Sequence, residues 1–238
     1  MTEHPEPVQL EELGSLVEIE SYQAWVHALC ARYHTDTHWL NYFRLKKGQA
    51  KQLQDELIPL GRLAQRLSPR FSGAKLRFLP GSKQSFDAEL IESTDRVAEI
   101  IEITLACNGQ QDALSTECLV EHGFVPLYSE IAATGTKTNR QIAEPELVSL
   151  DAQELTHICF EMIRYAVSRK SGSGKYHSGI SLLVAFDDFM LRPTEEDQDY
   201  LKGELLKLRS VFKTVYYVGL SGFFYFESVP TASGPSPR

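Results

Sequence analysis

Two acidic residues stand out because they lie in otherwise apolar stretches that have the pattern of β-strands. Asp87 belongs to residues 85–92, and Glu102 belongs to residues 97–106, which are rich in β-branched side chains. The four residues 93–96 between the two stretches are polar, which predicts an antiparallel hairpin. In this hairpin Asp87 is expected to face Glu102 on the same side of the sheet.

Two directly opposed carboxylates repel each other and destabilise a sheet, so their pairing needs a compensating charge. A hard divalent cation such as Mg²⁺ would supply it, because Mg²⁺ binds through one or two carboxylates, water and substrate phosphate. Such an ion can activate water for phosphodiester hydrolysis. Two alternatives stay open: a register shifted by one residue, which separates the pair, or neutralisation of each acid by Lys75 or Arg77 on a neighbouring strand.

The elements that must position this pair can be read from the hydrophobic periodicity. Residues 10–32 and 45–67 have apolar positions at three- and four-residue steps, which predicts a helical N-terminal segment over residues 10–70. Residues 34–38 interrupt the pattern, and Pro59 with Gly61 is expected to kink or split the second helix.

Beyond residue 74 the pattern changes to a mixture of strands and helices. Asp151 with Glu154 has the spacing of a capping box and predicts the start of a helix. The apolar run 180–186 is typical of a central strand covered on both faces. Further strands are expected at 75–79, 85–92, 97–106, 215–218 and 223–226, a short helix at 112–121, a loop at 132–144, and a last helix at 194–212 capped by Thr194.

The chain is therefore expected to form a single α/β domain over residues 10–230. In it, a helical segment (10–70) precedes a mixed sheet with helices (74–228), and the tails 1–9 and 231–238 are expected to be flexible.

At this point the residues resemble a known family. The runs Phe86-Asp87-Ala88-Glu89 and Ile101-Glu102-Ile103-Thr104, followed by a helix and a buried strand, resemble the PD-(D/E)XK nuclease superfamily, which has the restriction-endonuclease-like fold. The resemblance implies an αβββαβ core from about residue 45 to residue 186 and metal-dependent cleavage of DNA. It also implies that Mg²⁺ is held by Asp87, Glu102 and the backbone carbonyl of Ile103.

One position departs from the family pattern, because Thr104 stands where the family has a catalytic lysine. Lys170 extends the buried stripe of the preceding helix and Lys175 lies just beyond it, so either could replace that lysine. Asp87, Glu102, Lys170 and Lys175 are thus the expected catalytic residues. The alternative is a non-catalytic interaction or regulatory protein on the same scaffold, whose aromatic C-terminal segment 216–226 could form a homodimer surface.

Composition limits the remaining possibilities. The net charge of −8, from 24 Lys and Arg against 32 Asp and Glu, is unlike a simple electrostatic nucleic-acid binder, although a local basic groove can exist on an acidic protein. The four cysteines are widely spaced and form no paired zinc-ligand motif, so buried reduced thiols are expected. The N-terminal residues lack a secretory pattern and no apolar window approaches a membrane span. We therefore expect a cytoplasmic protein without a membrane partner.

Overall fold

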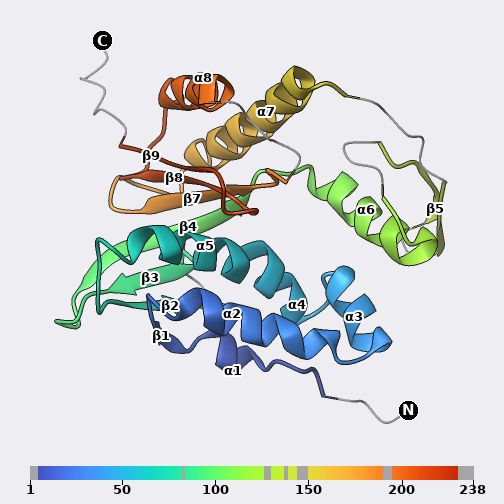
Figure 1. Ribbon diagram of the computed structural model, residues 1–238, viewed down its shortest axis with the longest axis horizontal. Helices are drawn as coiled ribbons and strands as arrows, with labels where there is room; N and C mark the ends of the chain where they lie inside the picture. Colours follow the sequence, from blue (N-terminus) through green and yellow to red (C-terminus); the bar gives the residue numbers. More distant parts are fainter. Residues whose placement is uncertain are drawn as a thin grey trace.

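The structure, a computed structural model, describes residues 5–81, 84–125, 130–136, 139–143, 150–189 and 195–229. Its centre is a seven-stranded mixed sheet with helices on both faces (Figure 1), so the expected α/β class is confirmed. The strand order is β1-β2-β3-β4-β7-β8-β9. Strands β1 to β4 are antiparallel neighbours, β4, β7 and β8 are parallel, and β9 is antiparallel to β8. The bounds are β1 Leu16–Glu18, β2 Lys75–Phe78, β3 Ala88–Ile91, β4 Val97–Leu105, β7 Ser181–Phe186, β8 Val215–Gly219 and β9 Tyr225–Ser228.

The helices fall into two layers and one projecting unit. The N-terminal helices cover one face of the sheet, and α7 and α8 cover the other (Figure 1). The unit formed by α6 and the hairpin β5–β6 lies beyond the end of β4. The bounds are α1 Leu10–Leu13, α2 Tyr22–Ala31, η1 Arg32–His34, α3 Thr37–Arg44, α4 Gln49–Gln52, η2 Leu53–Leu57, α5 Ile58–Leu67, α6 Gly109–His122, β5 Ala133–Thr136, β6 Asn139–Ile142, α7 Ala152–Ser171 and α8 Glu195–Leu206.

The central strands explain why the two layers are held together. All six residues of β7 are buried, as expected for a strand covered on both faces. Leu183 packs into the core below α5, whereas Leu182 and Val184 pack into the core below α7. The alternation of side chains along one strand therefore joins both hydrophobic cores through the sheet.

The N-terminal segment differs from its prediction in three places. The expected continuous helix over 10–32 is wrong: β1 separates α1 from α2, because residues 16–18 pair with β2 at the sheet edge. The interruption at 34–38 is also too long, since Asp36 caps α3 by accepting a hydrogen bond from the Trp39 N–H at 2.9 Å. The irregularity expected at Pro59 lies earlier, where the helix passes through the π-helical turn η2 before α5.

The region 107–150 contains more regular structure than expected. Helix α6 is longer than the predicted segment 112–121. The loop prediction for 132–144 is wrong, because β5 and β6 form an antiparallel hairpin there. Ile131 and Ile142 pack on Leu114 and Cys118 of α6, and this small core holds the hairpin in place.

Predictions for the N-terminal tail and the aromatic C-terminal segment can be checked against the described residues. Residues 5–9, assigned to a tail, lie against the body, because Val8 is fully buried and the Glu6 carboxylate accepts a hydrogen bond from the Tyr33 hydroxyl at 2.7 Å. Most of the aromatic segment 216–226 packs into the core, and Phe223 is its strongly exposed aromatic side chain (88%). Few of these aromatic side chains are therefore accessible for the predicted homodimer surface. Thr194 as a helix cap lies outside the described residues. No helix in the described part of the chain is long and apolar enough to cross a membrane.

Candidate active site

The β3–β4 hairpin has the register that places the two carboxylates together. Ala88 pairs with Ile101, and the backbone N–H of Asp87 donates to the Ile101 carbonyl at 2.9 Å. The next pair in this register is Asp87 opposite Glu102, and the two carboxyl groups are close enough to interact by hydrogen bonding. A one-residue slip is therefore excluded, and a bulge close to the turn absorbs the irregularity of the hairpin.

Asp87 carries a perturbed carboxyl group. Burial and the adjacent negative charge of Glu102 raise the pKa of Asp87 to about 6. The backbone N–H of Ile103 donates to its Oδ2 at 2.8 Å, and this bond opposes the rise by stabilising the charged form. Ile103 thus contributes its N–H to the site, whereas the family resemblance implied that its carbonyl is a metal ligand.

Glu102 is held by two side chains that come from the end of α7 and the turn after it. Its carboxylate is almost fully buried and accepts a hydrogen bond from the Tyr176 hydroxyl at 2.7 Å. The ammonium group of Lys170, in the last turn of α7, forms an ion pair with the same oxygen, Oε1. Of the two predicted lysines, Lys170 therefore joins the carboxylates, whereas Lys175 is exposed and its backbone N–H donates to the Ser173 hydroxyl.

Thr104, where the resemblance predicted a lysine, is contacted by an arginine from α7. Thr104 is buried two residues beyond Glu102, and the guanidinium of Arg169 donates to its Oγ1 at 3.3 Å. Arg169 was missed in the sequence because its neighbour Lys170 continues the apolar stripe of α7 more directly. The neighbouring residues Arg169 and Lys170 of α7 thus contact Thr104 and Glu102, which lie on the same face of β4.

A third carboxylate, also missed in the sequence, approaches from the opposite helical layer. Glu56 lies in the π-helical turn η2, which packs against β4. Burial raises the pKa of Glu56 to about 7, and the negative charges of Asp87 and, more weakly, Glu102 add to the rise. Little in the sequence indicated Glu56, because π-helical turns are frequent at functional sites but leave no mark on the hydrophobic pattern.

The donor set favours a hard cation that retains much of its water. Among the residues that the structure describes, no three His, Cys, Asp or Glu side chains form a ready-made metal cage. Asp87 and Glu102 nevertheless offer paired carboxylate oxygens, and Glu56 adds a negative charge beside them. Two carboxylates completed by water and phosphate are typical of Mg²⁺ sites.

Comparisons of this chain with protein-family models, with curated proteins and with solved structures give no match. The case for a function therefore rests on the geometry of Asp87, Glu102 and the groups around them.

Proposed function

We propose that this protein is a metal-dependent nuclease that acts on DNA phosphodiesters and has a restriction-endonuclease-like core. The observation that carries the proposal is the meeting of Asp87, Glu102 and Lys170. Lys170 lies 68 residues beyond Glu102 in the chain, yet its ammonium group forms an ion pair with the Glu102 carboxylate. Two acids and a lysine in contact are the charged groups that this kind of phosphodiester hydrolysis requires.

The order of elements supports the same proposal. A long helix (α4, η2 and α5) precedes the antiparallel strands β2, β3 and β4, and α7 then leads to β7, which is parallel to β4. This order agrees with an αβββαβ core. The unit of α6, β5 and β6 is an insertion between β4 and α7.

The residues would divide the work as follows. Asp87 and Glu102 would hold Mg²⁺, and Glu56 would help to attract it. The ion, when bound, supplies Lewis-acid activation of water and charge stabilisation at the phosphate. Lys170 and Tyr176 would orient the Glu102 carboxylate, because both contact its Oε1.

The cationic groups account for the departure at Thr104. Lys170 is partly exposed (20%), so its ammonium group can approach a phosphate as well as Glu102. Arg169, hydrogen-bonded to Thr104, places a second positive charge beside the same strand. Both would stabilise negative charge on the scissile phosphate, which is the role of the family lysine.

The experiment is a cleavage assay on single- and double-stranded DNA with Mg²⁺ or Mn²⁺. Asp87→Asn, Glu102→Gln and Lys170→Met should each reduce the cleavage rate by about 100-fold or more, because each removes a charge that acts on the transition state. Lys175→Met is the matched control, since it removes a nearby exposed lysine outside the cluster, and its rate should stay close to that of the wild type.

Two results would count against the proposal. Equal losses for Lys170→Met and Lys175→Met would show that general positive charge, not the site, is responsible. A wild type that binds DNA or a protein without cleaving any DNA would favour the alternative, a non-catalytic interaction protein, which Thr104 and the net charge of −8 also favour.

A further inference from the structure

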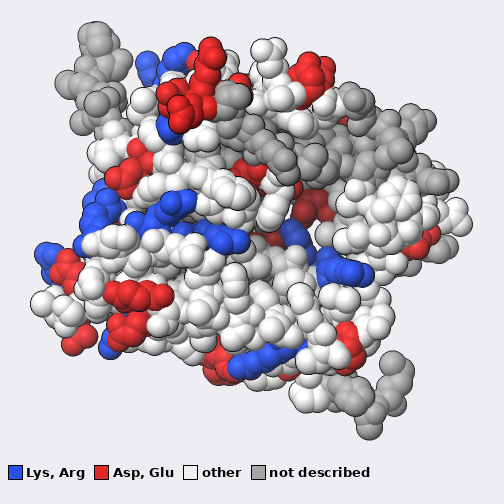
Figure 2. All heavy atoms as spheres, in the orientation of Figure 1, with Lys and Arg blue, Asp and Glu red and all other residues white. Residues whose placement is uncertain are grey.

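A concave region lies at the carboxyl ends of the parallel strands. It is a cleft of about 440 Å³ whose floor is formed by the last residues of β4 and β7, including Ala106 and Phe186. Helices α6 and α7 contribute its walls. Figure 2 shows this region as a hollow between the main body and the α6 unit. Ligands of open α/β sheets bind beyond the carboxyl ends of strands, and this volume suits a small molecule.

The charge of the cleft is negative. Lys46, its one lysine or arginine among the described lining residues, is already paired with Asp112 at 2.7 Å and with Asp55 at 2.9 Å. Glu130 and Asp187 also line the cleft, and within the described part of the chain neither forms an ion pair. Among the described lining residues, these two carboxylates have no ion-pair partner, so the cleft favours a cationic ligand over an anionic one.

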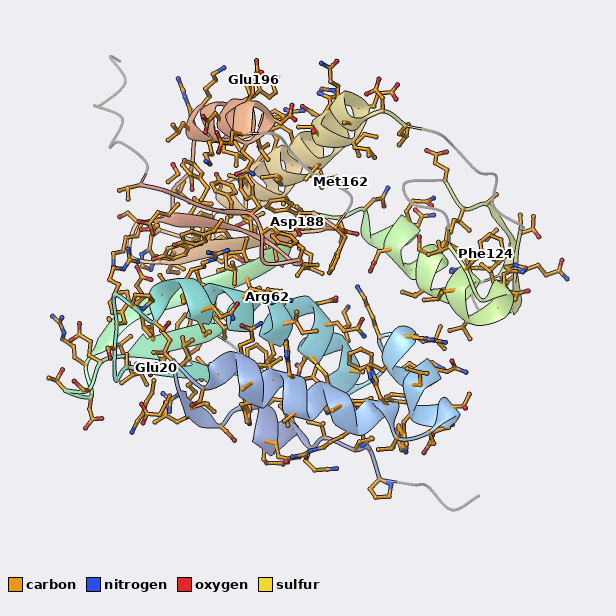
Figure 3. All side chains as sticks on the ribbon, in the orientation of Figure 1. Glu20, Arg62, Phe124, Met162, Asp188 and Glu196 are labelled. Carbon is orange, nitrogen blue, oxygen red and sulfur yellow. The ribbon has the colours of Figure 1, made fainter. Side chains whose placement is uncertain are left out.

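The rest of the wall is largely apolar. Ile158 and Met162 face the cleft from α7, and Leu220 borders it after β8. Met162 is labelled in Figure 3, where α7 passes above the strand ends. An apolar wall beside acidic groups gives a ligand two kinds of contact at once: burial of an apolar body and attraction of a positive charge.

We propose that this cleft binds a small organic cation, a protonated amine carried on an apolar body. The apolar body would lie on Met162, Ile158 and Leu220, and the ammonium group would lie near Asp187 and Glu130. The inference uses none of the residues Asp87, Glu102 or Lys170. Failure of the binding test would therefore leave the proposed nuclease function untouched, and failure of the nuclease assay would leave the proposed cation binding untouched.

The test is a calorimetric titration of the full chain with three probes of similar size: tryptamine, which is cationic, tryptophol, which is neutral, and indole-3-propionate, which is anionic. Tryptamine should bind more tightly than tryptophol, and indole-3-propionate should bind least. Equal affinities for tryptamine and tryptophol, or no tryptamine binding at millimolar concentration, would overturn the proposal.

Charge-removing variants locate the site. Asp187→Asn with Glu130→Gln should weaken tryptamine binding by about tenfold, the loss expected from two partly exposed charge pairs. Both side chains are exposed, and asparagine can still accept the hydrogen bond that Asp187 receives from the Phe189 N–H at 3.0 Å, so the fold should persist. Glu196→Gln, on exposed α8 (Figure 3), is the matched control and should leave the affinity unchanged. Equal weakening in this control would place the effect outside the cleft and overturn the assignment.

Discussion

At the scale of single residues, the candidate site contains carboxyl groups whose pKa values are raised above those of exposed acids. Burial and mutual repulsion raise the pKa of Asp87 to about 6 and that of Glu56 to about 7. A folded protein that holds such groups is less stable when they ionise, which is a common cost of a functional site. A bound cation would offset that cost.

This cost predicts how the stability of the metal-free protein depends on pH. Between pH 3.8 and about 6, folded Asp87 keeps a proton that the unfolded chain releases, so its contribution to stability falls as the pH rises through this window. Above about pH 6, Asp87 is ionised in both the folded and the unfolded state, and its full destabilising effect is present. Asp87→Asn should therefore raise the free energy of unfolding at pH 8 by on the order of 1 kcal/mol, with little effect at pH 4.

Urea unfolding at pH 4 and pH 8, with a chelator present, measures this difference. Glu161→Gln is the control, because Arg164 lowers the pKa of that exposed carboxyl group, and the variant should not become more stable at pH 8. An Asp87→Asn variant that is less stable than the wild type at pH 8 would contradict the assigned cause.

At the scale of elements, the turns and helix ends fix where functional side chains arrive. The capping box predicted at Asp151 and Glu154 is confirmed, with hydrogen bonds of 2.8 and 2.9 Å between side chain and backbone. It fixes the beginning of α7, whose last turn carries Lys170. The turn between β8 and β9 is fixed differently, because the buried Asp188 carboxylate (Figure 3) accepts hydrogen bonds from the backbone N–H groups of Ser221 and Phe224.

The β8–β9 turn requires glycine at position 219. A Cβ atom there would lie 1.9 Å from Asp188 Oδ2, a contact that the buried carboxylate cannot relieve without losing its hydrogen bonds. Gly219→Ala should lower the free energy of unfolding by about 2–3 kcal/mol. Gly203→Ala is the matched control in α8, where a Cβ atom meets open space, and it should raise stability by about 0.5–1 kcal/mol. Denaturant unfolding measures both changes. An unchanged free energy of unfolding in Gly219→Ala would show that the position of the Asp188 carboxylate does not contribute to stability.

At the scale of the whole molecule, a buried polar network crosses from the sheet to the helical layer. Glu99 of β4 is almost fully buried and accepts hydrogen bonds from the Tyr216 hydroxyl at 2.7 Å and from Ser181 at 3.4 Å. Arg70, just beyond α5, donates to the Tyr216 hydroxyl at 3.3 Å. The network thus joins β4, β7 and β8 to the end of the helix that covers them.

Removal of one hydroxyl should reveal the contribution of this network. Tyr216→Phe leaves the buried Glu99 carboxylate without its shortest hydrogen bond, so the free energy of unfolding should fall by about 1.5–3 kcal/mol. Tyr22→Phe is the matched control, because the Tyr22 hydroxyl is buried and has no hydrogen-bond partner in the described structure. That change should be neutral or stabilising. Similar losses in both variants, measured by urea unfolding, would argue against a special role for the network.

The amino-acid sequence by itself determined the parts of the site that depend on local pairing. Two strand-like stretches joined by a short polar link predicted a hairpin with Asp87 opposite Glu102, and this pair is present beyond a bulge near the turn. The capping box and the apolar run of β7 are local in the same way. Edge strand β1 and the hairpin β5–β6 escaped prediction, because their short, partly polar strands gain stability from their partners rather than from their own pattern.

Only the tertiary structure decided which other side chains reach the carboxylates. Glu56 and Arg169 lie in helices on opposite faces of the sheet, and Tyr176 follows a helix end, so none shares a local pattern with β4. Their positions depend on how each helix packs and rotates on the sheet, which is set by the summed burial of many distant apolar side chains. Lys170 could be predicted in part, because it continues a buried stripe, but its contact with Glu102 required the packed layers.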